Sequence, residues 1–188
     1  MKKIILIVVS VVFMLGMAGL MIYFITKKDT FRWGIALCGI ILSALPLGLL
    51  WLKNNPINTP SIIGYYAFLF FSIFLGSIGS FYDRFVWWDI AVHFYKGGFV
   101  ACVGITLYKI FIPEQARRGV SVWIPVLFVL GLAVVSSIIW EFYEFMGDVI
   151  ASHTMQRGGN TDTMYDLLAG FTGGLLIAIY TSIRKQHV

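Results

Sequence analysis

The chain has 188 residues, of which 59% are hydrophobic and 12% are charged, and its mean hydropathy is +0.86. Because an ordinary soluble domain is about 45–50% apolar and about 25% charged, this composition excludes a soluble globular domain, a disordered chain and a nucleic-acid-binding module. The formal net charge of +5 comes from Lys and Arg residues at the ends of apolar segments, where such residues set the orientation in a membrane.

Six apolar segments follow one another along the chain, and each has about the 20 residues that a helix needs to cross a bilayer. The predicted spans are approximately residues 4–25, 34–52, 62–81, 87–111, 121–145 and 164–183. Pro46 lies inside the second span, where we expect a kink. The sequence therefore predicts an all-α fold, a polytopic integral membrane protein built as a bundle of six transmembrane helices, with residues 1–188 in a single domain.

The first segment begins like a signal peptide, with Lys2 and Lys3 before an apolar run. A cleaved signal peptide has an apolar region of about 7–15 residues and a small-residue cleavage site. The run in this chain is longer, has no A-x-A pattern and leads directly into Lys27 and Lys28. The pattern favours a retained transmembrane helix over a cleaved signal.

The distribution of Lys and Arg predicts the orientation. With the N-terminus inside, eight of these residues fall on the inner side and five on the outer side, and Lys96 lies within a span. Because positive residues accumulate in cytoplasmic loops, the count favours cytoplasmic termini, whereas Lys27, Lys28 and Arg32 argue for the opposite orientation. We expect a multi-pass protein of the cell (inner, cytoplasmic) membrane, whose partner is the lipid bilayer and not nucleic acid.

Seven of the nine acidic residues belong to two connections, or to adjoining helix ends, that emerge on one face of a six-span bundle, predicted to be the outer face. They are Asp83, Asp89, Glu141, Glu144, Asp148, Asp162 and Asp166. The nearby cations are Arg84, Lys96 and Arg157, so seven minus three leaves four uncompensated negative charges if every group is ionised. Partly buried like charges repel one another, and such a cluster therefore needs protons, a metal ion or a cationic ligand.

Helical spacing divides these residues into two stripes, each on one face of a helix. The fourth span contributes Asp89, His93 and Lys96. Glu141, Glu144 and Asp148 repeat this pattern near the end of the fifth span. With Arg157, Asp162 and Asp166, they make up the predicted binding site near the outer membrane boundary. Within it, His93, Glu141, Glu144 and Asp166 are the candidate ligands of a divalent metal ion.

Several of these residues also have a purely structural interpretation. Thr163-x-x-Asp166 resembles a helix capping box, and Asp162 would then also serve the start of the sixth helix. Lys96 would neutralise Asp89 or a carboxylate of the fifth helix. Gly170-x-x-x-Gly174 favours close helix packing over a phosphate-binding loop.

Three stretches carry a family resemblance. They are Asp89-Ile-Ala-Val-His93-Phe with the following Lys96-Gly97-Gly98, Trp140-Glu141-x-x-Glu144-Phe145, and Asp162-Thr163-x-x-Asp166. In them the chain resembles the YjdF-like family of bacterial inner-membrane proteins and, more loosely, VanZ-like membrane proteins. The resemblance implies an integral membrane protein with a polar site linked to cell-envelope or lipid chemistry, and it implies no particular activity.

Three functions are compatible with this pattern. The first is binding or transport of a cation, a proton or a lipid-type amphiphile headgroup, and here Glu141, at the end of a long apolar stretch, is expected to matter more than Asp162. The second is a metal-dependent membrane enzyme that acts on a lipid-linked envelope substrate, with one nitrogen and several oxygens suited to Zn, Mn or Fe. The third is a structural or assembly subunit whose acids form a salt-bridge network.

Overall fold

The computed structural model describes residues 2–51, 58–150, 155–156 and 158–183. All regular structure in these ranges is helical, which confirms the all-α class. Six helical segments are long and apolar enough to cross a membrane, as predicted. They are Lys2–Thr26, Thr30–Trp51, Thr59–Ile78, Trp88–Phe111, Trp123–Ile150 and Asn160–Ile183.

The helices group into two compact units, Met1–Trp88 and Asp89–Val188. The single domain expected from the sequence stays a prediction.

The first unit contains α1 (Lys2–Thr26), α2 (Thr30–Ala44), η1 (Leu45–Trp51), α3 (Thr59–Leu69), η2 (Phe70–Ile78) and α4 (Phe81–Arg84). The second span changes from an α-helix to a 3₁₀-helix at Leu45, next to Pro46. Proline has no N–H group to continue the α-helical hydrogen bonds, which accounts for the change to a tighter helix, and the kink stays a prediction. The η2 segment is a π-helix of nine residues.

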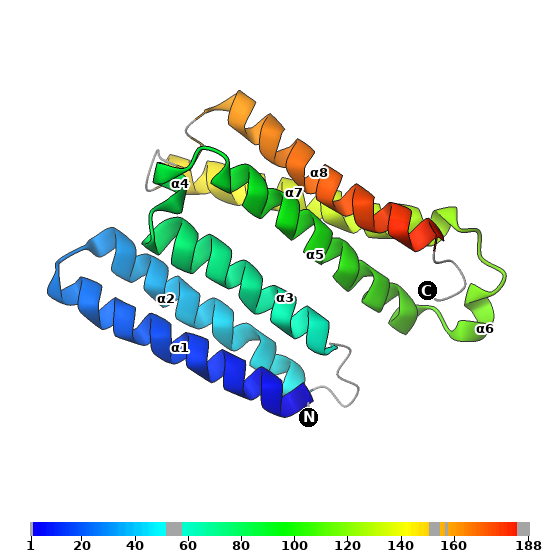
Figure 1. Cartoon of the computed structure of the whole chain (residues 1–188), viewed down its shortest axis with the longest axis horizontal. Helices are drawn as coiled ribbons and strands as arrows, with labels where there is room; N and C mark the ends of the chain where they lie inside the picture. Colours follow the sequence, from blue (N-terminus) through cyan, green and yellow to red (C-terminus); the bar gives the residue numbers. More distant parts are fainter. Residues whose placement is uncertain (1, 52–57, 151–154, 157, 184–188) are drawn as a thin grey trace. The chain divides into compact units, whose positions relative to one another are not determined.

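Buried hydrogen bonds link the first three helices of this unit, which lie side by side in Figure 1. The Tyr66 hydroxyl on α3 donates to the carbonyl of Ser43 at 2.8 Å, and it lies 2.5 Å from Ser10 Oγ on α1. Leu6, Ile62 and Leu69 form the apolar core around them. Polar contacts of this kind connect helices in an environment where lipid offers no hydrogen-bond partner.

The second unit contains α5 (Trp88–Phe111), α6 (Glu114–Arg117), α7 (Trp123–Ile150) and α8 (Asn160–Ile183). In Figure 1, α5 and α8 run in the same direction and α7 runs in the opposite direction. The end of α7 and the start of α8 differ from the predicted spans. Asp148 and Asp162 fall in a predicted connection, whereas α7 includes Asp148 and α8 includes Asp162.

Small residues form the contact between α5, α7 and α8, and we call this contact the helix seam. Its residues are Gly97, Gly98, Ala133, Ser137, Gly170, Gly173 and Gly174. A Cβ atom on Gly97 would overlap the carbonyl group of Gly170, and one on Gly173 would overlap the carbonyl of Phe94. The helix backbones therefore approach more closely than larger side chains would allow, as the packing interpretation of these glycines expects.

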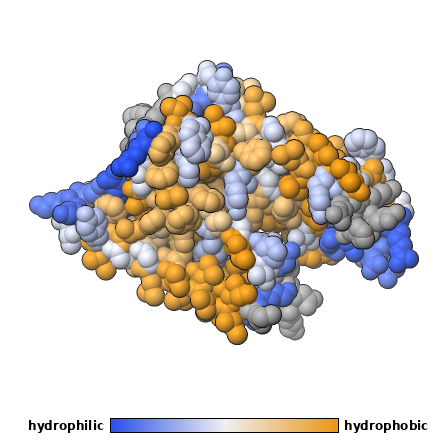
Figure 2. Space-filling view, in the orientation of Figure 1, coloured by the Kyte–Doolittle hydropathy of each residue, from blue (hydrophilic) through white to orange (hydrophobic). Residues whose placement is uncertain are grey.

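Large hydrophobic side chains are exposed along the long helices, and orange hydrophobic surface covers much of the face shown in Figure 2. On α7, for example, Ile139 is 61% exposed and Phe142 is 64% exposed. A soluble protein rarely shows so much apolar surface, whereas a lipid bilayer solvates it. The exposed apolar surface therefore indicates a membrane protein, as the hydrophobic composition does.

Candidate functional site

The polar residues of the second unit gather where α5 begins, α7 ends and α8 begins. Because α7 runs against the other two helices, these three helix ends meet at one end of the unit (Figure 1). Residues far apart in the sequence are thereby brought together inside a bundle of membrane-spanning length.

The helix seam positions the site. His93 lies four residues before Gly97 on α5, and Asp166 lies four residues before Gly170 on α8. Glu141 lies four residues after Ser137 on α7. Residues four apart share a helix face, so the faces that pack closely at the seam carry these side chains one turn further on.

Four side chains form what we call the inner cluster: His93, Glu141, Glu144 and Asp166. One ligand atom from each lies within 4.8 Å of those from the others. Their exposed fractions are 0%, 5%, 8% and 1%, respectively. Both carboxylate oxygens of Glu141 and Asp166, together with His93 Nε2 and Glu144 Oε2, have no hydrogen-bond partner among the described residues.

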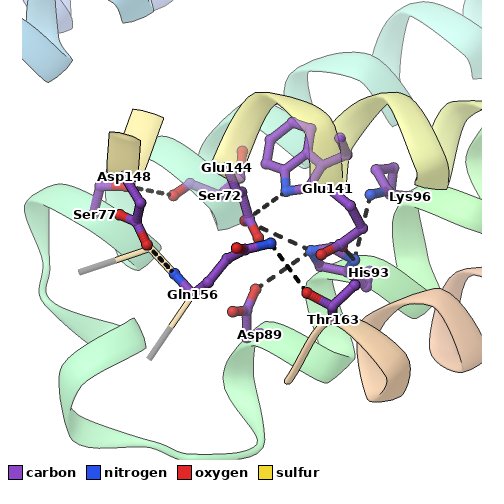
Figure 3. Close-up of polar contacts among 11 residues, drawn as sticks. Ser72, Ser77, Asp89, His93, Lys96, Glu141, Glu144, Asp148, Gln156 and Thr163 are labelled. Carbon is purple, nitrogen blue, oxygen red and sulfur yellow. Dashed lines mark hydrogen bonds and ion pairs between the residues drawn. The ribbon is translucent and has the colours of Figure 1, made fainter. Parts of the chain in front are cut away.

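His93 lies at the centre of this group, and Figure 3 shows carboxylates around its ring. Its Nδ1 atom is 3.5 Å from Glu141 Oε1. Its Nε2 atom is 3.5 Å from Asp89 Oδ1 and 3.9 Å from Glu144 Oε1. These separations exceed the roughly 2.7–3.2 Å of a good hydrogen bond. An imidazole binds one ion through a single nitrogen, so the relevant spacing is that of one ligand atom from each residue. That spacing is within 4.8 Å, close to the roughly 4.4 Å that two ligands at about 2.0–2.2 Å from one metal ion can span.

Lys96 is the cation buried beside these acids, with 5% of its surface exposed. Its Nζ atom lies 4.7 Å from the centre of the Trp140 ring. It also lies 3.4 Å from His93 Nδ1 (Figure 3). The Trp140 indole N–H in turn donates to Glu144 Oε1 at 2.8 Å. Trp140 thus holds both a cation and a carboxylate of the site.

Trp140 is not among the site residues predicted from the sequence, where it appears only in a stretch of family resemblance. A signal for its role was present, because it precedes Glu144 by four residues and shares its helix face.

Three aspartates form what we call the outer cluster: Asp89, Asp162 and Asp166. One oxygen atom from each lies within 4.8 Å of those from the others. Asp89 and Asp162 are half-buried and come from the first turns of α5 and α8. Asp166 belongs to both clusters, so the two groups of ligands are adjacent.

Asp148 lies outside both clusters. Its carboxylate accepts hydrogen bonds from the backbone N–H groups of Met155 and Gln156, each at 2.8 Å. The Gln156 side chain then donates to Thr163 Oγ1 at 3.0 Å. Asp148 therefore organises the connection between α7 and α8.

Two further expectations concern that connection. Because α8 begins at Asn160, Thr163 and Asp166 lie inside the helix, and the capping-box interpretation of this pair is wrong. The predicted binding residue Arg157 lies outside the described residues.

Charge in the two clusters is unbalanced. Their five carboxyl groups belong to Asp89, Glu141, Glu144, Asp162 and Asp166. Against them stands the buried cation Lys96, so five minus one leaves four negative charges if every acid is ionised and His93 is neutral. A buried excess of this size is costly unless protons or cations compensate for it.

The apolar helices and their exposed hydrophobic surface define an integral membrane protein with several spans. A model of the family described as "Predicted membrane protein (DUF2238)" matches residues 8–187, and the chain belongs to this family. It is also similar to a protein of Thermotoga maritima described as "Uncharacterized protein", with 33% identity over 99 residues. The match covers 53% of this chain and 50% of that relative, so the chain spans about half the relative's length. No solved structure matches this chain.

Proposed function

We propose that the second unit binds a divalent metal cation at the inner cluster. The observation that carries this proposal is the set of buried carboxylate oxygens on Glu141, Glu144 and Asp166 that lack hydrogen-bond partners around His93. Buried polar atoms normally have partners, and each one left unpaired costs about 1–3 kcal/mol, or more when charged. A cation coordinated by these atoms would offset that cost.

The ligand chemistry favours a particular group of ions. One imidazole nitrogen and three carboxylates suit Zn²⁺, Mn²⁺ or Fe²⁺ better than Ca²⁺, which prefers six to eight oxygen ligands. The Trp140 hydrogen bond to Glu144 fixes the orientation of one ligand from outside the coordination shell. Such outer contacts are common around metal ligands.

A salt-bridge network explains the cluster less well. Lys96 lies over the Trp140 ring and beside His93, and none of the ion pairs found among the described residues involves it. One lysine also cannot neutralise five acids. The geometry therefore supports a site that takes up a cation. It supports less well a salt-bridge network whose charges are already balanced.

Glu141→Gln is expected to weaken Mn²⁺ binding by at least about tenfold, which corresponds to about 1.4 kcal/mol. The substitution keeps the size of a buried ligand and removes its charge. Binding is measured on the purified full chain in detergent, from the loss of the electron paramagnetic resonance signal of free Mn²⁺.

Glu114→Gln is the matched control, because Glu114 is an exposed acid on α6 that pairs with Arg118 outside the inner cluster. It should bind Mn²⁺ like the parent chain. Absence of Mn²⁺ binding in the parent chain, or equal affinity in the parent chain and Glu141→Gln, would contradict the proposed site.

We also propose that the protein resides in the bacterial inner membrane with both termini in the cytoplasm and the two clusters near the outer boundary. The Lys and Arg count and the resemblance to YjdF-like proteins support this orientation. The acidic end of the second unit would then meet cations from outside the cell.

This orientation predicts that Asn160→Cys reacts with a membrane-impermeant maleimide added to intact cells. Asn160 is exposed at the start of α8, close to the outer cluster. The background chain carries Cys38→Ser and Cys102→Ser, because both native cysteines are exposed on their helices. Labelling only from the cytoplasmic side would reverse the proposed orientation.

A further inference from the structure

We infer that a second divalent cation binds at the outer cluster, and that Asp166 bridges the two ions in one two-cation centre. This inference rests on the proposed function, because it extends the inner site by one neighbour. Asp89 and Asp162 would supply the remaining protein ligands of the second ion.

Asp166 is the residue that points to this arrangement. It is 1% exposed, and neither of its carboxylate oxygens has a hydrogen-bond partner among the described residues. One of its oxygen atoms lies within 4.8 Å of ligand atoms of the inner cluster, and one lies within 4.8 Å of oxygen atoms of Asp89 and Asp162. A carboxylate has two oxygens with separate lone pairs, so one group can serve two ions.

Charge balance favours two ions over one when every acid is ionised. The two clusters together hold five carboxylates and Lys96, which leaves four negative charges. One divalent cation would leave two of them uncompensated, whereas two divalent cations cancel all four. A centre of two divalent ions is therefore the arrangement that neutralises the site without protons.

The two positions would differ in chemistry. The inner position includes the His93 nitrogen and is almost fully buried, which suits a transition-metal ion. The outer position offers oxygen ligands only, and Asp89 and Asp162 are half-buried. Hard cations such as Mg²⁺ and Mn²⁺ accept such sites and complete their shells with water.

The test measures the stoichiometry and magnetic coupling of Mn²⁺ bound to the full chain in detergent. Two Mn²⁺ ions per chain, with a spin-coupled spectrum from close ions, are expected. Asp162→Asn should bind a single Mn²⁺ with an uncoupled six-line spectrum, because the inner cluster stays intact. Glu114→Gln removes an exposed acid that lies on α6 outside both clusters, and it should keep two coupled ions.

The other possible outcomes show whether the second position, the bridging role of Asp166 or the whole site is wrong. One Mn²⁺ per chain that Glu141→Gln abolishes would overturn the second position and leave the inner site standing. Two Mn²⁺ ions without spin coupling would overturn the bridging role of Asp166. No bound Mn²⁺ in the parent chain would overturn both this inference and the proposed function.

Discussion

Lys96→Met is expected to lower the melting temperature of the metal-free protein and to increase the stabilisation that Mn²⁺ produces. Lys96 is the buried cation among the acids of the two clusters, and its removal leaves their negative charge uncompensated in the metal-free protein. The contact with the Trp140 ring is lost as well. With the lysine gone, a bound cation no longer meets a positive charge in the site, so it binds more tightly.

The measurement is the melting temperature in detergent, once with a chelator and once with saturating Mn²⁺. Lys109→Met is the matched control, because Lys109 is exposed near the other end of α5. It should change neither the metal-free melting temperature nor the Mn²⁺ effect by a comparable amount. Equal behaviour of the two variants would mean that Lys96 does not compensate the acidic charge.

Gly97→Ala is expected to destabilise the second unit by about 1–3 kcal/mol and to weaken Mn²⁺ binding. The added Cβ atom would overlap the Gly170 carbonyl group, which is backbone and cannot rotate away as a side chain can. Separating α5 from α8 would also move His93 away from Asp166, since each lies one turn from this contact. Melting temperature and Mn²⁺ affinity therefore fall together.

Gly98 on α5 and Gly131 on α7 supply controls. A Cβ atom on Gly98 would make an ordinary 3.5 Å contact with the Gly173 carbonyl oxygen, and one on Gly131 would meet nothing within 4 Å. Gly98→Ala and Gly131→Ala should both melt at or above the temperature of the parent chain, because alanine is the better helix former. If Gly97→Ala matches them in stability and Mn²⁺ affinity, the seam does not position the site.

Hydropathy predicts the six spans because crossing a bilayer demands apolar length, but it locates their ends poorly. Residues 145 and 164 were the predicted limits around the last connection, whereas α7 continues to Ile150 and α8 starts at Asn160. Acidic residues lower hydropathy without breaking a helix when their side chains point into a bundle. The π-helix from Phe70 to Ile78 has no sequence signal of this kind, since it reflects local backbone packing.

The candidate site was likewise predicted in part from the sequence. Spacing along a helix predicts that Asp89 and His93 share a face, and in the structure Asp89 Oδ1 lies 3.5 Å from His93 Nε2. Spacing also assigned Asp148 to the stripe of Glu141 and Glu144, but its carboxylate binds backbone N–H groups of the connection. Periodicity shows which face a residue occupies, whereas its partners depend on the connection that follows.

The helix seam has a thermodynamic consequence for any ion held beside it. Burying glycine and alanine costs almost no side-chain conformational entropy, whereas a buried leucine costs about 0.5–1 kcal/mol and a methionine about 1.5–2 kcal/mol. Close to Gly97 and Gly170, the separation of α5 and α8 is therefore set by backbone against backbone, without long side chains that can change rotamer. His93 and Asp166 project from this stiff contact, so the space between them resists expansion, and ions with a larger radius than the ligands accommodate should be rejected by size.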